Sequence, residues 1–339
     1  MHITALVKDL DHVCCRYRVL PFRSYLERSG HSFDVRAWPG FWPSRLLLLH
    51  QLRRTDVLLV QRRLFPAWQL RLLRRQVSWL VYDFDDAVFL RNSYNPRGHD
   101  SAARTRRFDE MVQLADAVVA GNEFLHDQVL SVTEPSRIHV IPTCVDAERY
   151  PMAAHKPDRP TTHLVWVGSS STIRGLELLA PVLENVGKGN AGLRLKVICD
   201  RSLALQHLPV DFCPWREKTE ADDIAAADVG ISWLPDDPWS RGKCGLKVLQ
   251  YMAAGLPVVA NRVGVQAQMV KHGETGFLAE TPAQWQEAIV RLAGDPALRL
   301  RMGRAARRWV EAEYDVPVGA SLWLTLLDRL QSNSLAKAG

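Results

Sequence analysis

The sequence of 339 residues has no long apolar run and few cysteines. A membrane-spanning helix needs about 18 to 20 consecutive apolar residues, and the best candidate, residues 46–49, is followed by His50, Arg53 and Arg54. The N-terminus lacks the charged and then apolar segments of a signal peptide, so we expect a cytoplasmic protein. The six cysteines show neither paired metal-ligand spacing nor a disulfide-rich pattern, which indicates free thiols.

Acidic residues are scarce in one stretch, residues 36–75. It contains nine arginines against a single acid, Asp56, in a chain whose formal net charge is +6. The same stretch is rich in aromatic residues: Trp38, Phe41, Trp42, Phe65 and Trp68. It has no helix-turn-helix, zinc-finger or aromatic RNA-binding signature, so its composition does not favour nucleic acid as a partner. We predict instead that it docks on an anionic membrane surface, which attracts arginines and accepts aromatic side chains.

Strands and helices alternate along the whole chain, which predicts an α/β fold built from parallel sheets. The apolar content of 47% and the charged content of 24% are typical of a globular protein, and the length suffices for two domains. We predict a first doubly wound domain over residues 1–150, a linker over residues 151–162 and a second doubly wound domain over residues 163–317.

The most informative stretch is residues 241–260, which reads as a loop, a helix, a turn and a strand. Its apolar residues recur at intervals of three and four, the spacing of one buried helical face: Leu246, Leu249, Met252 and Ala253. Gly255 and Pro257 end this helix, and the apolar residues 258–260 predict a short buried strand.

The start of this helix has the features of an anion site. Gly242 and Gly245 leave backbone N–H groups unpaired at the positive end of the helix dipole. Lys243 and Lys247 lie beside that end, where a cation is unfavourable unless an anion binds nearby. A bound diphosphate group would satisfy both the N–H groups and the lysines.

The stretch from Arg241 to Ala260 resembles the donor-binding motif of the retaining glycosyltransferases of family four. Most members have two glutamates about eight positions apart, where this chain has Gly242 and Gln250. The chain is closer to a branch with Lys-Cys-x-x-Lys and Gln-Tyr-Met-Ala. The resemblance implies the GT-B architecture, in which two Rossmann-like doubly wound domains face each other across a cleft and a C-terminal helix, here residues 318–335, packs back on the first domain.

The resemblance also implies an activity. A sugar would move from a nucleotide-sugar donor to a glycan or lipid-linked saccharide, with retention of configuration and without a cofactor, in the synthesis of cell-surface polysaccharide or glycolipid. In this family the donor's own diphosphate is thought to take the acceptor's proton, so the enzyme must stabilise charge on the leaving group. Lys247, Arg174 and the helix terminus at Gly245 fit this catalytic task.

The second domain supplies the predicted donor site. After the strand 163–168, three serines and a threonine precede Arg174, whose planar guanidinium suits a phosphate. The family commonly has an arginine where this chain has Ser169, and a lysine where it has Arg174. We predict that these residues bind the donor: Gly168, Ser169, Ser170, Lys243, Gly245, Leu246 and Gln250.

A cluster of carboxylates follows the predicted strand 77–82, at Asp83, Asp85 and Asp86. Crowded carboxylates are unfavourable unless cations or hydrogen bonds meet them, which favours a functional cleft. By resemblance, Asp85 and Asp86 take the places of a histidine–aspartate pair near the donor sugar, so we predict a catalytic Asp85. The Asp-x-Asp-Asp pattern also fits a divalent metal, but the resemblance implies a metal-independent enzyme. The predicted acceptor or cleft residues are Arg16, Arg18, Asp86 and Asn122.

Two other functions stay open from the sequence. A nucleotide-sugar epimerase shares this architecture but needs acid and base groups that face the sugar. A nucleotide-sugar binding protein without turnover is the second alternative, because Gln250 replaces a glutamate. Glutamine still donates and accepts hydrogen bonds, so we predict an active, hexosyltransferase-like enzyme. The basic and aromatic stretch 36–75 predicts that this enzyme lies at the inner face of the cytoplasmic membrane.

Overall fold

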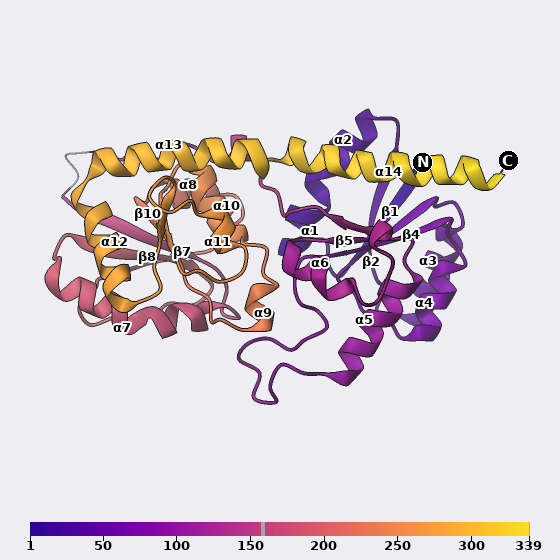
Figure 1. Ribbon diagram of the computed structural model, residues 1–339, viewed down its shortest axis with the longest axis horizontal. Coiled ribbons are helices and arrows are strands. Elements are labelled where there is room, and N and C mark those ends of the chain that lie inside the picture. Colours follow the sequence, from indigo (N-terminus) through magenta and orange to yellow (C-terminus); the bar gives the residue numbers. More distant parts are fainter. Residues whose placement is uncertain (157–159, 339) are drawn as a thin grey trace. The chain divides into compact units, whose positions relative to one another are not determined.

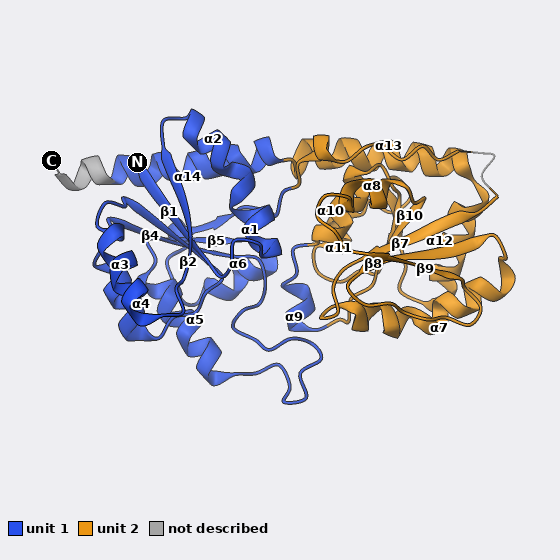
Figure 2. Ribbon diagram, turned by 180° about the vertical axis from the view of Figure 1, so that it is seen from behind, with its two compact units in different colours: residues 1–144, 237–244, 316–339 blue, residues 145–236, 245–315 orange. Residues whose placement is uncertain are grey.

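The computed structural model describes residues 1–156 and 160–338, with side chains described up to residue 333. The chain divides into two compact units (Figure 1, Figure 2). Unit 1 comprises residues 1–144, 237–244 and the chain from 316 onward, and unit 2 comprises residues 145–236 and 245–315. Segment 237–244 thus belongs to unit 1, although the sequence placed it in the second domain. Residues 157–159 of the predicted linker lie outside the described residues.

Unit 1 is built on a sheet in which every neighbouring pair of strands is parallel. Within the described residues its order is β2 (Ser32–Ala37), β1 (His2–Val7), β3 (Val57–Gln61), β4 (Trp79–Phe84), β5 (Ala117–Ala120) and β6 (Ile138–Val140). The residues of β3 and β4 are all buried, as expected of a parallel sheet that is covered on both faces.

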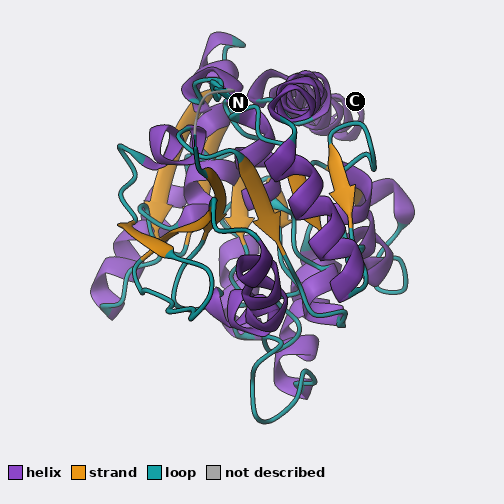
Figure 3. Ribbon diagram, turned by 90° about the vertical axis from the view of Figure 1, so that its left-hand side faces the viewer, coloured by secondary structure: helices purple, strands orange, loops and turns teal. Residues whose placement is uncertain are grey.

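Helices cover both faces of this sheet. Figure 3 distinguishes the helices (purple) from the strands (orange). One core contains side chains from α3 (Trp42–Leu52), α4 (Ala67–Arg74), α5 (Ala102–Leu114) and α6 (Glu123–Val129). The other contains side chains from α1 (Val13–Arg18), α2 (Arg23–Arg28) and α14 (Val316–Ala338). Strand residues alternate between the two cores: Leu58 and Val60 face the first, and Val57 and Leu59 the second.

The helical segment between Val13 and Arg28 is not one continuous helix. Helix α1 ends at Arg18, a 3₁₀ turn follows over Leu20–Phe22, and α2 begins at Arg23. Pro21 in this turn explains the break, because proline lacks the N–H group that a helix interior needs and clashes with the preceding turn.

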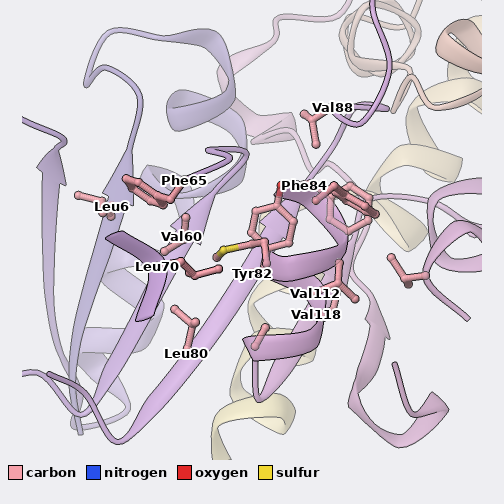
Figure 4. Packing of buried hydrophobic residues seen from close by; sticks show 14 of the residues in the cluster. Leu6, Val60, Phe65, Leu70, Leu80, Tyr82, Phe84, Val88, Val112 and Val118 are labelled. Carbon is pink, nitrogen blue, oxygen red and sulfur yellow. The ribbon is translucent and has the colours of Figure 1, made fainter. Parts of the chain in front are cut away.

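Aromatic packing holds the end of β4 in place (Figure 4). The rings of Tyr82 and Phe84 are stacked with centroids 5.4 Å apart, and both meet Phe108 of α5 edge to face. Strand β4 ends at Phe84, two residues later than predicted, so Asp83 pairs with Gln61 inside the sheet. Only Asp85 and Asp86 of the carboxylate cluster lie beyond the strand.

Unit 2 repeats the same layered plan. Within the described residues its parallel sheet has the order β12 (Gly276–Leu278), β11 (Val258–Ala260), β10 (Val229–Ser232), β7 (Thr162–Val167), β8 (Leu193–Cys199) and β9 (Val210–Pro214). Its helices are α7 (Ile173–Gly189), α8 (Glu220–Ala225), α10 (Leu246–Ala253), α11 (Gln266–Met269), α12 (Pro282–Gly294) and α13 (Pro296–Glu313). Among all helices in the described part of the chain, none combines the length and the apolar character needed to cross a membrane.

Candidate functional site

The carboxylates at the end of β4 are met by cations of the protein itself. Asp83 and Arg18 form an ion pair in the interior, where both side chains are almost completely excluded from solvent. The Arg18 guanidinium also donates to the carbonyl oxygen of Ile141 at 2.7 Å. Burial lowers the pKa of Arg18, but the charge and the hydrogen bond of Asp83 outweigh burial and raise this pKa above its ordinary value, so the guanidinium stays charged. Arg18, predicted as a cleft residue, thus lies in the interior and fixes Asp83.

Arg62 connects the two carboxylates beyond the strand. Its Nη2 donates to Asp86 Oδ2 at 2.6 Å, and its Nη1 lies 3.4 Å from Asp85 Oδ1. Arg62 has a left-handed backbone, with a φ of 60°, directly after β3. Such a conformation is unfavourable for a residue with a side chain and is found mostly where the surroundings enforce it. We did not single out Arg62 from the sequence; its position directly after a parallel strand is the signal that could have revealed it.

The cations keep Asp85 ionised. Burial tends to raise the pKa of Asp85, but the charges of Arg62 and Arg18 outweigh burial and leave the pKa below its ordinary value. Asp85 also accepts a hydrogen bond from Gln61 Nε2 at 3.4 Å. The predicted catalytic carboxylate is therefore held as an anion on a scaffold of fixed side chains.

Lys243 belongs to this cluster in unit 1. Its Nζ lies 2.9 Å from Asp86 Oδ1 and 4.7 Å from the centroid of the Trp239 ring. Both lysine and tryptophan come from segment 237–244, which contains the short helix α9 (Pro238–Arg241; Figure 2). The predicted contact of Lys243 with the donor stays a prediction, since the ammonium is paired with Asp86 here.

Close packing leaves no room for a side chain at Gly242. A Cβ at Gly242 would lie 2.9 Å from the backbone nitrogen of Ala87, so no larger residue fits without a shift of the main chain. Asn122 caps α6 by accepting from Leu125 N at 2.8 Å. Its Nδ2 donates to the carbonyl oxygen of Lys243 at 3.1 Å, so Asn122 also ties segment 237–244 to unit 1.

The remaining observations on the predicted site residues concern Arg16 and a possible metal site. Arg16 is half-buried, and its guanidinium carbon lies 5.3 Å from the centroid of the Tyr17 ring. In the described part of the chain, no group of three or more histidine, cysteine, aspartate and glutamate side chains has the geometry to hold a metal ion. The roles predicted for Arg16 and Asp86 in acceptor binding stay predictions.

In unit 2, helix α10 begins at a glycine with a left-handed backbone. Gly245, directly before α10, has a φ of 66°, a backbone conformation that favours glycine. A Cβ there would also lie 2.5 Å from Met269 Sδ. In the described residues no side chain caps the first turn, which starts with Leu246. The N-terminal N–H groups of α10 therefore have the arrangement of an anion site.

Lys247 lies in the first turn of α10, above an aromatic ring of the neighbouring strand. Its Nζ is 4.2 Å from the centroid of the Trp166 ring on β7. An edge of the same ring meets Gly168, where a Cβ would lie 2.4 Å from Trp166 Cη2. Tyr251 fixes this arrangement, because its hydroxyl accepts from Val167 N at 2.8 Å. The start of α10 and the loop after β7 are thus brought together, as predicted.

The serine loop is ordered by its own hydrogen bonds. Ser169 N donates to Thr172 Oγ1 at 3.1 Å, and Ser169 Oγ lies 2.8 Å from Ser171 Oγ. Ser170 donates to Asp200 through both its N–H group, at 2.6 Å, and its hydroxyl, at 2.8 Å. Hydrogen bonding by the Ser170 hydroxyl is the main cause that lowers the pKa of Asp200. The donors of Ser170 are therefore engaged by a carboxylate, and its predicted contact with the donor stays a prediction.

Arg174 and Gln250 differ in exposure. The Arg174 side chain is 60% exposed and its Nη1 lies 3.2 Å from Glu177 Oε2, on the same helix. Glu177 also pairs with Arg201. Gln250 is only 3% exposed, and its Nε2 donates to the Tyr150 hydroxyl at 3.2 Å. Arg174 can turn toward a phosphate in solvent, whereas a ribose would reach Gln250 only after a local rearrangement.

Comparison with known proteins identifies one domain of the chain. Residues 161–295 match the model of the family described as glycosyl transferases group 1. The chain carries a group 1 glycosyltransferase domain. This confirms the family resemblance drawn from the donor motif, and the group 1 domain coincides with most of unit 2.

Curated proteins resemble part of the chain. The chain is 30% identical over 189 residues to D-inositol 3-phosphate glycosyltransferase of Pseudarthrobacter chlorophenolicus, which covers 50% of this chain and 45% of that protein. The chain spans about half the length of the first curated relatives that it matches.

Solved structures resemble the whole chain. Sucrose-phosphate synthase from Thermosynechococcus elongatus has a TM-score of 0.76 at 16% identity, with 98% of this chain and 100% of that chain covered. Anabaena HepE in complex with UDP and glucose has a TM-score of 0.70 at 17% identity, with 97% and 100% covered. At these identities the likeness shows the fold alone, and it confirms the predicted GT-B fold.

Proposed function

We propose that the protein transfers a sugar from a nucleotide-sugar donor, with retention of configuration, to a glycan or lipid-linked saccharide. Unit 2 would bind the donor through the start of α10, and unit 1 would supply the acceptor site and the ionised Asp85. The observation that carries the proposal is the position of Lys247, half-buried over Trp166, beside the Gly168 loop and within the match to group 1 glycosyltransferases.

The chemistry of this site suits a leaving diphosphate. Negative charge develops on the diphosphate as its bond to the sugar breaks, and the helix terminus at Gly245 and the Lys247 ammonium would stabilise it. One preorganised donor of this kind contributes about 3 to 4 kcal/mol to the stabilisation of a transition state. Arg174 would add a second cation. The solved relative that contains UDP and glucose supports a uridine nucleotide as the first donor to test.

Donor binding tests this proposal directly. We expect UDP and UDP-glucose to raise the melting temperature of the full chain in a saturable way, because a ligand that binds only the folded state stabilises it. Lys247→Ala should weaken this shift, and Lys271→Ala is the matched control. Lys271 is a second lysine of unit 2 whose Nζ lies over an indole ring, 3.5 Å from the centroid of Trp309, outside the donor motif. Equal shifts in the two variants would contradict the donor assignment.

We further propose that unit 1 attaches to the inner face of the cytoplasmic membrane through α3 and its neighbourhood. Apolar side chains that are between 55% and 67% exposed support this: Phe41, Trp42, Leu46, Leu47 and Trp68. The predicted leucine run is split, because Leu48 is buried in the core and Leu49 packs against it. Some of the arginines are also paired within the fold, as in Arg74 with Asp116. Exposed Arg53 and Arg54 remain near the end of α3 to meet anionic lipid.

Cosedimentation with vesicles tests the attachment. We expect binding to vesicles that contain anionic phosphatidylglycerol, with less binding at high salt, because each basic group near such a surface contributes about 1 kcal/mol. Arg53→Glu/Arg54→Glu should release the protein. Arg304→Glu/Arg308→Glu, which makes the same charge change at exposed positions of α13, is the control. Equal binding to neutral vesicles, or equal loss in both variants, would contradict attachment through α3.

A further inference from the structure

Unit 1 contains a cavity of about 450 Å³ next to the ends of β1 and β3. This volume falls in the range of about 300 to 1,000 Å³ that is usual for small-molecule sites. The polar side chains that line it include five cations and His12, and no aspartate or glutamate is among its described lining residues. The cations are Lys8, Arg62, Arg63, Arg104 and Arg107. The edge formed by the carboxyl ends of parallel strands is where ligands of such sheets bind.

Most of this positive charge is not neutralised by the protein. Arg62 pairs with Asp85 and Asp86. For the other four cations, no carboxylate lies within ion-pair distance in the part of the chain that the structure describes. Like charges around a confined space raise the free energy of the empty site, and an anion lowers it. The lining is thus complementary to a ligand with several negative charges.

Neighbouring groups orient two of the lining arginines, Arg63 and Arg104, although Lys8, Arg104 and Arg107 are exposed. The Arg63 guanidinium lies 5.7 Å from the Trp38 ring and 5.2 Å from the Phe65 ring. Burial, and then the charge of Arg45, lowers the pKa of Arg63, so the empty site is unfavourable for its cation. Arg104 donates to the carbonyl oxygen of Leu90 at 3.0 Å, which orients its guanidinium.

His12 adds a neutral donor. Its Nδ1 accepts a hydrogen bond from Cys14 N at 3.2 Å, so the neutral ring carries its proton on Nε2. Burial, and then the charges of Arg62 and Lys8, lowers the pKa of His12 and keeps the ring neutral near pH 7. An imidazole N–H beside several guanidinium groups is a suitable set of donors for phosphate oxygens.

We propose that this cavity binds a phosphate or diphosphate group of the acceptor. The proposal deepens the proposed function, on which it rests, and names the acceptor as a phosphorylated molecule. A soluble sugar phosphate and a lipid phosphate share this chemistry. A cavity of this volume also has room for the group to which the phosphate is attached.

Calorimetric titration of the full chain tests the cavity separately from the donor site. The titrations use the Lys247→Ala background, so that the proposed donor site contributes little, with inorganic diphosphate and water-soluble dihexanoyl phosphatidic acid as probes. Lys8→Ala/Arg107→Ala removes two lining cations, and the control is Arg106→Ala, the exposed neighbour of Arg107 on α5 that does not line the cavity. Loss of charge-assisted hydrogen bonds should raise the dissociation constant by about tenfold or more in the double variant. It should stay within about twofold of wild type in the control.

The two probes separate the possible sources of the phosphate. If the double variant loses affinity for both probes, the result supports a lipid phosphate. If it loses affinity for diphosphate alone, the result supports a soluble phosphorylated acceptor. The proposal is wrong if neither probe binds saturably, if the double variant binds like Arg106→Ala, or if glucuronate competes as well as diphosphate does. Failure of the proposed function has a different signature, because UDP binding would then be insensitive to Lys247→Ala while the cavity result is unaffected.

Discussion

The ammonium of Lys247 lies 4.2 Å from the centroid of the Trp166 ring, which joins the first turn of α10 to the end of β7. Trp166 is only 2% exposed, and the same ring closes against Gly168. The contact therefore holds a half-buried cation in one place at the start of a helix, where the dipole opposes it. A cation fixed in this way is prepared for an anionic ligand.

Lys247→Ala should separate activity from stability. We expect turnover to fall by about 100-fold, because a preorganised contact with the leaving group is lost. The free energy of unfolding should change by less than about 1 kcal/mol, the usual worth of a solvent-accessible cation–π contact. Steady-state kinetics and urea denaturation measure the two quantities. Lys271→Ala, which removes the equivalent contact with Trp309, should leave turnover near the wild-type value.

Arg174 and Arg201 offer a matched pair, since both lie on the surface and both pair with Glu177. Exposed ion pairs contribute at most about 1 kcal/mol to stability, so neither alanine variant should unfold. If Arg174 binds the diphosphate, Arg174→Ala lowers turnover by at least about tenfold and Arg201→Ala does not. A similar rate in both variants would show that Arg174 is a surface charge only.

Asp83 and Asp85 should respond differently to the same chemical change. Asp83→Asn removes the partner of the buried Arg18 cation, which costs about 3 to 5 kcal/mol of stability. Asp85→Asn should act mainly on turnover, because Arg62 keeps its contact with Asp86. Thermal unfolding and the turnover rate per folded molecule, measured for both variants, distinguish a loss of stability from a loss of catalysis.

We also expect EDTA to leave activity unchanged. Loss of activity on chelation, with recovery in Mg²⁺ or Mn²⁺, would contradict the metal-independent mechanism.

The buried His155 should make unit 2 sensitive to mild acid. Its Nε2 lies 2.8 Å from the carbonyl oxygen of Gly255, and burial is the main cause that lowers its pKa below the ordinary value of 6.5. The unfolded chain therefore binds a proton at a higher pH than the folded one, and stability falls as the pH decreases below about 6.5. Urea midpoints at pH 8 and pH 5.5 should differ less for His155→Gln than for wild type. An unchanged difference would mean that His155 is not responsible.

Much of the fold follows from local sequence signals. The apolar residues 258–260 predicted a buried strand, and Gly245 predicted the start of α10. Each of these depends on neighbours within a few residues, so periodicity and capping preferences suffice to find them.

The details of the candidate site depend on contacts between distant residues and were harder to predict. Arg18 meets Asp83 in the interior, and Arg62 bridges Asp85 and Asp86. The sequence does not show which carboxylate each arginine meets, because pairing of charges is decided by the packed structure. The position of segment 237–244 in unit 1 has the same origin, since it depends on close contacts such as that of Gly242 with Ala87.

Incubation of the full chain with a panel of nucleotide sugars, in the absence of an acceptor, is the most direct measurement of the central claim. We predict that at least one donor binds saturably and is slowly hydrolysed, with free sugar and nucleoside diphosphate released in equal amounts and at a rate that Lys247→Ala reduces by about 100-fold. Conversion of the bound sugar to an epimer would show an epimerase instead. Saturable binding without any release would show a binding protein, and either result would contradict the proposed transferase.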